Sequence, residues 1–103
     1  MKELTLETSN WRTVQVFLSP TLTGIFEVEA DVDNGRVRCN CPTYRSRVAC
    51  KHTRFVKKRI DENDGHYSVV VPSFIADEDI EKASETPEGF REFVVRWGKV
   101  EVL

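Results

Sequence analysis

The sequence predicts an α+β fold: a small antiparallel sheet with a ββα core, a second short helix and one or more strands towards the C-terminus. Two patterns lead to this prediction. Apolar and polar residues alternate with the two-residue period of a strand over 11–18, 26–41 and 67–71, whereas the apolar residues of 50–63 follow the spacing of one helix face. The chain has 103 residues, a length typical of one domain, and we expect 1–103 to fold as a single domain.

The N-terminal strand of this domain is predicted over 11–18. Apolar residues alternate there with Thr13, Gln15 and Phe17, as they do in a strand that buries one face. Pro20 interrupts the pattern, and we expect the strand to end before it.

The segment 26–41 predicts a β-hairpin. Apolar residues alternate with acids from Phe26 to Asp33, and the pair Asn34-Gly35 follows, which favours a two-residue turn because both residues tolerate a positive φ. Such a turn sets the pairing Asp33–Arg36, Val32–Val37, Asp31–Arg38, Ala30–Cys39 and Val28–Cys41. In this register apolar residues face one another, acids face bases, and both cysteines point to the buried face.

A helix is predicted from Cys50 to about Asn63. Residues at helical spacing form its apolar side: His52, Phe55 or Val56, and Ile60. The helix ends where Asn63 is followed by Asp64 and Gly65, since glycine is favoured just after a helix C-terminus.

The C-terminal segment, 66–103, predicts a strand, a helix and further strands. The order expected is a strand over 67–71, a short helix from Ser73 to about Glu85, a turn over 86–89, a strand over 93–97 and a hairpin that returns 100–103. The strand over 93–97 rests on the alternation of Phe93, Val95 and Trp97.

All three cysteines and one of the two histidines lie within residues 39–52, as Cys39-x-Cys41 and Cys50-x-His52. Three cysteines cannot all pair with one another, but with the histidine they make the ligand set of a tetrahedral zinc site. Two alternatives are free buried thiols, which would leave polar groups unsatisfied, and an iron–sulfur cluster, which usually takes four cysteines. Residues two apart in a helix diverge by about 200°, so Cys50 has to lie at or before the helix start if it is to converge with His52.

The spacing C-x-C-x8-C-x-H resembles the SWIM-type zinc finger. In that family a strand runs into C-x-C, which is often followed by proline, and C-x-H begins a helix with apolar residues after the histidine. Here these features are Val37-Arg38-Cys39-Asn40-Cys41-Pro42 and Cys50-Lys51-His52-Thr53-Arg54-Phe55-Val56. The resemblance covers about residues 25–62 and implies that the ligands of one zinc ion are Cys39, Cys41, Cys50 and His52.

SWIM fingers usually belong to larger proteins, among them chromatin-remodelling ATPases, transposases and recombination factors. This chain has no glycine-rich phosphate loop and no room for a motor domain, which leaves a binding role. Four protein ligands leave no position for water or substrate on zinc, so we expect a structural ion and no enzyme activity. We interpret His66 as a strand-end residue, and Asp77-Glu78-Asp79 as a solvated helix start.

The sequence also favours an intracellular protein without a membrane or small-molecule partner. No apolar run approaches the length of about 18 residues that predicts a membrane span. The first residues lack the apolar stretch of a secretory signal, and an intracellular location keeps thiols reduced.

Basic residues are concentrated in the predicted metal-binding segment. Nine Lys or Arg and no acid lie from Arg36 to Arg59, whereas all 17 acids lie outside and the whole chain carries a net charge of −2. The residues predicted to contact nucleic acid are Arg45, Arg47, Lys51, Arg54 and Lys58 for phosphates and Tyr44 for stacking on a base.

Two functions remain open at this stage. One is nucleic-acid binding, and the resemblance to SWIM-type fingers implies DNA rather than RNA. The other is a protein-interaction adaptor whose basic face docks on an acidic surface or on a larger DNA-processing partner. Salt-dependent binding to duplex DNA separates the two, because phosphate contacts release counterions.

Overall fold

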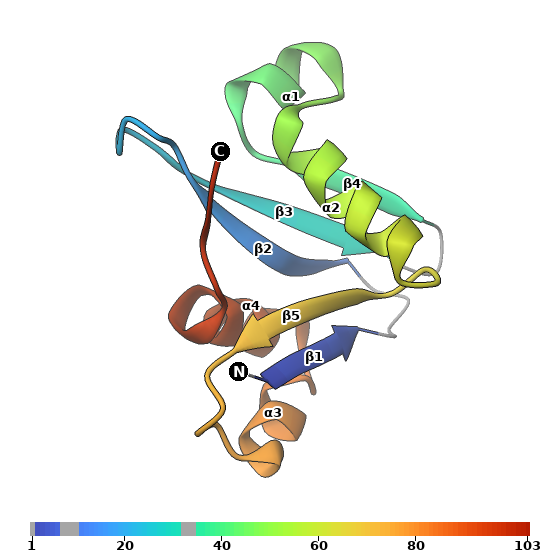
Figure 1. The fold of residues 1–103 in the computed structure, drawn as a ribbon, viewed down its shortest axis with the longest axis vertical. Coiled ribbons are helices and arrows are strands. Elements are labelled where there is room, and N and C mark those ends of the chain that lie inside the picture. The colour runs from blue at the N-terminus through green and yellow to red at the C-terminus, as the bar shows by residue number, and fades with distance from the viewer. Residues whose placement is uncertain (1, 7–10, 32–34) are drawn as a thin grey trace.

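The computed structural model describes residues 2–6, 11–31 and 35–103. Its elements, in chain order, are β1 (Lys2–Leu6), β2 (Arg12–Leu18), β3 (Ile25–Asp31), β4 (Arg36–Cys39), α1 (Pro42–Arg47), α2 (Lys51–Glu62), β5 (Tyr67–Val71), α3 (Asp77–Ala83), α4 (Pro87–Trp97) and β6 (Glu101–Val102). Figure 1 shows α1 towards one end of the molecule and α3 at the other, with the strands between them. None of the described helices is long and apolar enough to cross a membrane.

The larger sheet has the strand order β4-β3-β2-β6. β2, β3 and β4 are antiparallel neighbours, and β6 joins β2 in parallel through the pairs Phe17–Glu101 and Leu18–Val102. The predicted α+β class is confirmed, with a strand–strand–helix unit formed by β3, β4 and α2. However, the sheet is mixed rather than antiparallel, because β6 pairs with β2 and not with a strand directly before it.

A second sheet joins the two strands β1 and β5, which run antiparallel from Lys2–Val71 to Leu6–Tyr67. The predicted strand over 67–71 is confirmed, and its alternate residues Tyr67, Val69 and Val71 are buried. β1 has no counterpart among the predicted strands. The five residues of β1 contain only two apolar residues, both leucine, and so short an alternation does not by itself predict a strand.

The hairpin of β3 and β4 is present, but its register differs from the prediction by two residues. The observed pairs are Asp31–Arg36, Ala30–Val37, Glu29–Arg38 and Val28–Cys39. Residues 32–34, which include Asn34 of the predicted turn, lie outside the described residues, and Gly35 has a φ of 62°. A shift of two keeps every side chain on its predicted face, whereas a shift of one would have reversed all of them. Cys39 and Cys41 are therefore buried as expected, although Cys41 lies beyond the last paired residue.

β2 is buried on both faces, where the alternation predicted one buried face. Six of its seven residues are buried. Its polar side chains find partners on distant elements: Arg12 Nη1 donates to the carbonyls of Ser84 and Thr86 at 3.0 and 3.1 Å, and Gln15 Nε2 donates to that of Lys99 at 2.6 Å. These long-range hydrogen bonds let polar residues occupy a buried strand.

The region after β5 differs most from the prediction. A helix, α4, occupies Pro87–Trp97, where a turn over 86–89 and a strand over 93–97 were predicted. Thr86 is its N-cap, accepting a hydrogen bond from the Gly89 amide at 3.0 Å, and proline takes the first helical position. Phe93 is buried together with Val94, whereas Val95 is 47% exposed, so the period is helical.

Two smaller corrections concern the same region. α3 begins at Asp77 with Ala76 as its N-cap and ends at Ala83, so Ser73 does not cap it. The acids of its first turn are exposed, as the interpretation of a solvated helix start requires. The predicted hairpin over 98–103 is wrong, because α4 precedes β6 and the strand pairs with β2 instead.

Candidate metal centre

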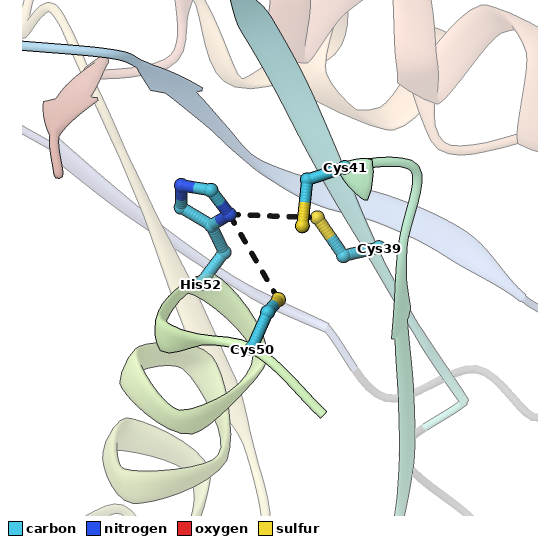
Figure 2. Close-up of side chains that lie close together, drawn as sticks. All are labelled: Cys39, Cys41, Cys50 and His52. Carbon is cyan, nitrogen blue, oxygen red and sulfur yellow. Dashed lines mark hydrogen bonds between the residues drawn. The ribbon is translucent and has the colours of Figure 1, made fainter. Parts of the chain in front are cut away.

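Two short segments bring the four predicted ligands together (Figure 2). Cys39 is the last residue of β4, and Cys41 follows in an extended conformation (φ −75°, ψ 156°), which a following proline favours. Cys50 is the N-cap of α2, and His52 lies in the first turn of that helix. Cys50 thus lies at the helix start, as predicted, which lets it converge with His52.

The spacer between the two ligand pairs contains α1, a helix that was not among the predicted elements. Pro42 occupies its first position, and none of its residues is buried, so it lacks an apolar face that would reveal it. Val48 ends the helix in the left-handed conformation, with φ 56°, and its amide donates to the carbonyl of Tyr44. The turn at Val48 directs the chain towards Cys50.

The distances within the cluster fit a single tetrahedral ion. The four ligand atoms all lie within 4.8 Å of one another, and His52 Nδ1 is 3.7 Å from Cys39 Sγ and 3.8 Å from Cys50 Sγ. Around tetrahedral zinc, with bonds of about 2.3 Å to sulfur and about 2.0 Å to nitrogen, ligand atoms are separated by about 3.5–3.8 Å. The residues could therefore hold one metal ion after small movements.

The pKa values of two of the thiols are shifted in opposite directions. Burial raises the pKa of Cys39 to about 12, partly offset by a hydrogen bond from the Cys41 backbone. Burial also tends to raise the pKa of Cys50, but hydrogen bonds from the backbone and side chain of Thr53 outweigh it and lower the pKa below its ordinary value. A cysteine at a helix N-terminus is expected to favour the thiolate, which is the form that binds metals.

The surroundings of His52 favour its neutral form. Burial lowers its pKa, assisted by the charge of Lys51 and opposed by the backbone of Leu103. Its ring centroid lies 4.7 Å from that of Phe17 and 5.5 Å from that of Phe26, so aromatic rings surround the imidazole. Nδ1 lies within 3.8 Å of two of the sulfur atoms, and Nε2 is buried. A neutral imidazole in this position is the form that coordinates metals.

Thr53 belongs to the site, although the sequence analysis did not identify it. Its amide donates to Cys50 Sγ at 3.4 Å, and its hydroxyl accepts from the Cys50 amide at 3.1 Å, a reciprocal pair called a capping box. The signal in the sequence was that Thr53 lies three residues after the predicted helix start at Cys50, the position of the second residue of a capping box. It is weak here, because capping boxes usually combine Ser or Thr with Glu or Gln.

The basic residues predicted to contact nucleic acid lie on α1 and α2. They are all exposed: Arg45, Arg47, Lys51, Arg54 and Lys58. Lys58 lies 3.9 Å from Glu62 in an exposed pair, and within the described residues no carboxylate contacts the other four. Tyr44 is half-buried, and its hydroxyl donates to the carbonyl of Val37 at 3.2 Å, so its ring is held against β4.

No family model matches this chain, and neither does any curated protein or solved structure. The resemblance to SWIM-type zinc fingers therefore rests on the Cys and His spacing and on the cluster that it forms.

Proposed function

We propose that this chain is a zinc-binding module without enzyme activity, and that it binds nucleic acid, DNA in particular, through the exposed basic side chains of α1 and α2. The observation that carries the proposal is the convergence of Cys39, Cys41, Cys50 and His52 directly beside these side chains. One ion would thereby hold the basic helices in a set orientation on the sheet.

Zinc is the metal that best suits this ligand set. Three thiolates and one imidazole are among the usual ligands of structural zinc, and four protein ligands leave no site for water or substrate. The cluster is buried, with Cys50 1% and His52 3% exposed, which suits a closed structural site rather than an open catalytic one.

Nucleic acid is proposed because the cations near the ion lack carboxylate partners. Arg45 and Arg47 lie on α1, Lys51 and Arg54 in the first turn of α2, and within the described residues none of them forms an ion pair. Unpaired surface cations attract phosphates and release the counterions of DNA on contact. The chain as a whole carries −2, so any such attraction has to be local.

Zinc is tested by metal analysis and calorimetry on freshly purified protein. We expect one zinc per chain. At neutral pH the Cys39 thiol, with its pKa near 12, has to lose a proton on binding, whereas His52 is already neutral. Titrations in two buffers of different ionisation enthalpy should therefore reveal proton release. Folded protein that contains no zinc would contradict the proposal.

Nucleic-acid binding is tested by its salt dependence. If about four phosphates are contacted, the slope of log K against log salt is about −3.6 for duplex DNA. The double variant Arg45→Ala/Arg47→Ala should reduce that slope by about one to two while zinc content stays the same. Binding that is absent at low salt, or unaffected by the double change, would favour the alternative adaptor function with an acidic protein surface as partner.

A further inference from the structure

A groove of about 510 Å³ lies beside the metal centre, between β4, α1 and α2. The residues that line it include Val37 of β4, Val48 at the end of α1, and Arg54 and Lys57 of α2. Trp11, the residue before β2, also lines the groove. The volume is in the range of about 300–1,000 Å³ that is usual for small-ligand sites.

Among the described residues, the charged ones that line this groove are all cations: Arg36, Arg38, Arg54 and Lys57. Two of them have carboxylate neighbours on β3, since Arg38 forms two hydrogen bonds to Glu29 at 3.1 and 3.2 Å, and Arg36 pairs in the ladder with Asp31. The other two, on α2, contact no carboxylate in the described ranges. The groove therefore offers two available positive charges, both on α2.

Two aromatic residues line the same groove. The guanidinium carbon of Arg38 lies 4.2 Å from the ring centroid of Trp11, and Arg38 also pairs with Glu29, so the indole packs against an anchored side chain. Tyr44 is fixed in its turn by the hydrogen bond to Val37. Rings that are already ordered lose little conformational freedom when a ligand stacks on them.

From this combination we propose that the groove binds an unpaired nucleotide of single-stranded nucleic acid, with the base against Trp11 and Tyr44 and a phosphate on Arg54 and Lys57. This inference rests on the proposed nucleic-acid binding and makes it more specific. The groove would bind single strands, and it does not include the α1 cations Arg45 and Arg47. Aromatic rings beside a cationic wall are the usual means by which proteins hold single strands.

Duplex DNA does not fit this arrangement. Its bases are stacked on each other and expose only their edges, so aromatic rings inside a concave groove have no base face to contact. An acidic peptide could satisfy the cations, but it would leave the two rings without a planar partner. An unpaired nucleotide supplies a planar base for the two aromatic rings and a phosphate for the two cations of α2.

Trp11 provides the readout. In a Trp97→Phe background it is the remaining tryptophan, since the chain has two. We expect oligothymidylate to quench its fluorescence, and we expect its duplex with oligoadenylate, inorganic phosphate and polyglutamate each to quench it much less. Stronger quenching by polyglutamate than by oligothymidylate would overturn the proposal and assign the groove to an acidic protein segment.

Variants separate this site from the proposed duplex contacts. By anisotropy of labelled oligothymidylate, Trp11→Ala should lower affinity at least about fivefold, as expected for loss of one stacked base. Lys57→Gln, at an exposed position that leaves the fold intact, should reduce the single-strand salt slope by about 0.7. Lys82→Gln on α3 is the matched control and should change neither.

The failures of the two proposals are distinguishable. Salt-dependent binding to duplex with no response of Trp11 to oligothymidylate would overturn the groove and leave the proposed function standing. Equal effects of Lys57→Gln and Lys82→Gln on single-strand binding would also overturn the groove. If neither nucleic acid binds, both proposals fail together.

Discussion

The metal-centre region and the C-terminal region each pack a helix against the same sheet, but by different means. α2 starts at the cluster of thiols and imidazole, and His52 and Thr53 are among its buried residues. α4 packs on β2, and its buried residues, Phe90, Phe93 and Val94, are all apolar. Figure 1 shows α2 in the upper part of the molecule, near β4, and α4 lower, beyond β2.

The difference lies in what each attachment requires. Buried polar atoms are unfavourable unless an ion or a hydrogen bond satisfies them. The packing of the start of α2 therefore depends on a partner for its buried thiol and imidazole. Buried apolar side chains are stabilised by their removal from water and need no ligand. Loss of metal, a change of pH and truncation of side chains should therefore act unequally on the two regions, and five measurements test this expectation.

The largest effect is expected from loss of the metal site. Zinc binding in small finger peptides contributes about 10–16 kcal/mol at neutral pH, comparable to or above the stability of a whole domain. Cys50→Ser should abolish stoichiometric zinc and lower the midpoint of thermal unfolding. Hydrogen exchange measured on this variant should show a larger loss of amide protection in α2 than in α4. An unchanged unfolding midpoint would contradict a structural role for the ion.

Truncation of the α4 core should destabilise the protein without releasing metal. Phe93→Ala removes a buried aromatic ring and should lower the free energy of unfolding by about 3–5 kcal/mol, measured by denaturant titration. Val95→Ala is the control, because Val95 is 47% exposed and should change stability by less than about 1 kcal/mol. Similar losses at both positions would instead indicate a strand over 93–97.

A smaller effect is expected at the hydrogen bond that links the two sheets. The Tyr67 hydroxyl donates to Gln15 Oε1 at 2.7 Å, and both side chains are buried. Tyr67→Phe should lower the free energy of unfolding by about 1–3 kcal/mol, because the amide oxygen loses its donor. An unaltered stability would show that another donor replaces the phenol.

The same tyrosine predicts a loss of stability at alkaline pH. Burial raises the pKa of Tyr67 from 10.0 to about 12, so the unfolded chain releases the phenol proton at a lower pH than the folded protein. Stability should therefore fall as pH rises from 10 towards 12, and Tyr67→Phe should lack this component. Denaturant titrations of both proteins across this interval provide the measurement.

The smallest effect is expected for the ion pair between α4 and β3. Arg91 forms two hydrogen bonds to Glu27 at 2.8 and 2.7 Å, but its side chain is 54% exposed. Exposed ion pairs contribute only about 0–1 kcal/mol, so Arg91→Ala should lower stability by no more than that and only at low salt. A loss above this range would mean that α4 relies on polar as well as apolar contacts.

The sequence by itself determined the candidate ligand set and the two segments that carry it. Cys39, Cys41, Cys50 and His52 are close in the chain, and few ligand chemistries suit three thiols and an imidazole. The two-residue period brought both strand cysteines to the buried face, and the divergence of helical residues placed Cys50 at the start of α2. These inferences depend on short distances along the chain, which local geometry controls.

Only the tertiary structure decided the remaining features. The register of β3 on β4, the pairing of β1 with β5 and the parallel partner of β6 depend on contacts between residues far apart in sequence. Phe93, Val95 and Trp97 fit a strand by alternation, but Phe90, Phe93, Val94 and Trp97 also fit one face of a helix, and Thr86-Pro87 was the available start signal. Packing against β2 selects the helix, because a helix buries three apolar side chains on one face. In addition, Arg12 of β2 donates hydrogen bonds to the carbonyls of Ser84 and Thr86 at the α4 N-terminus.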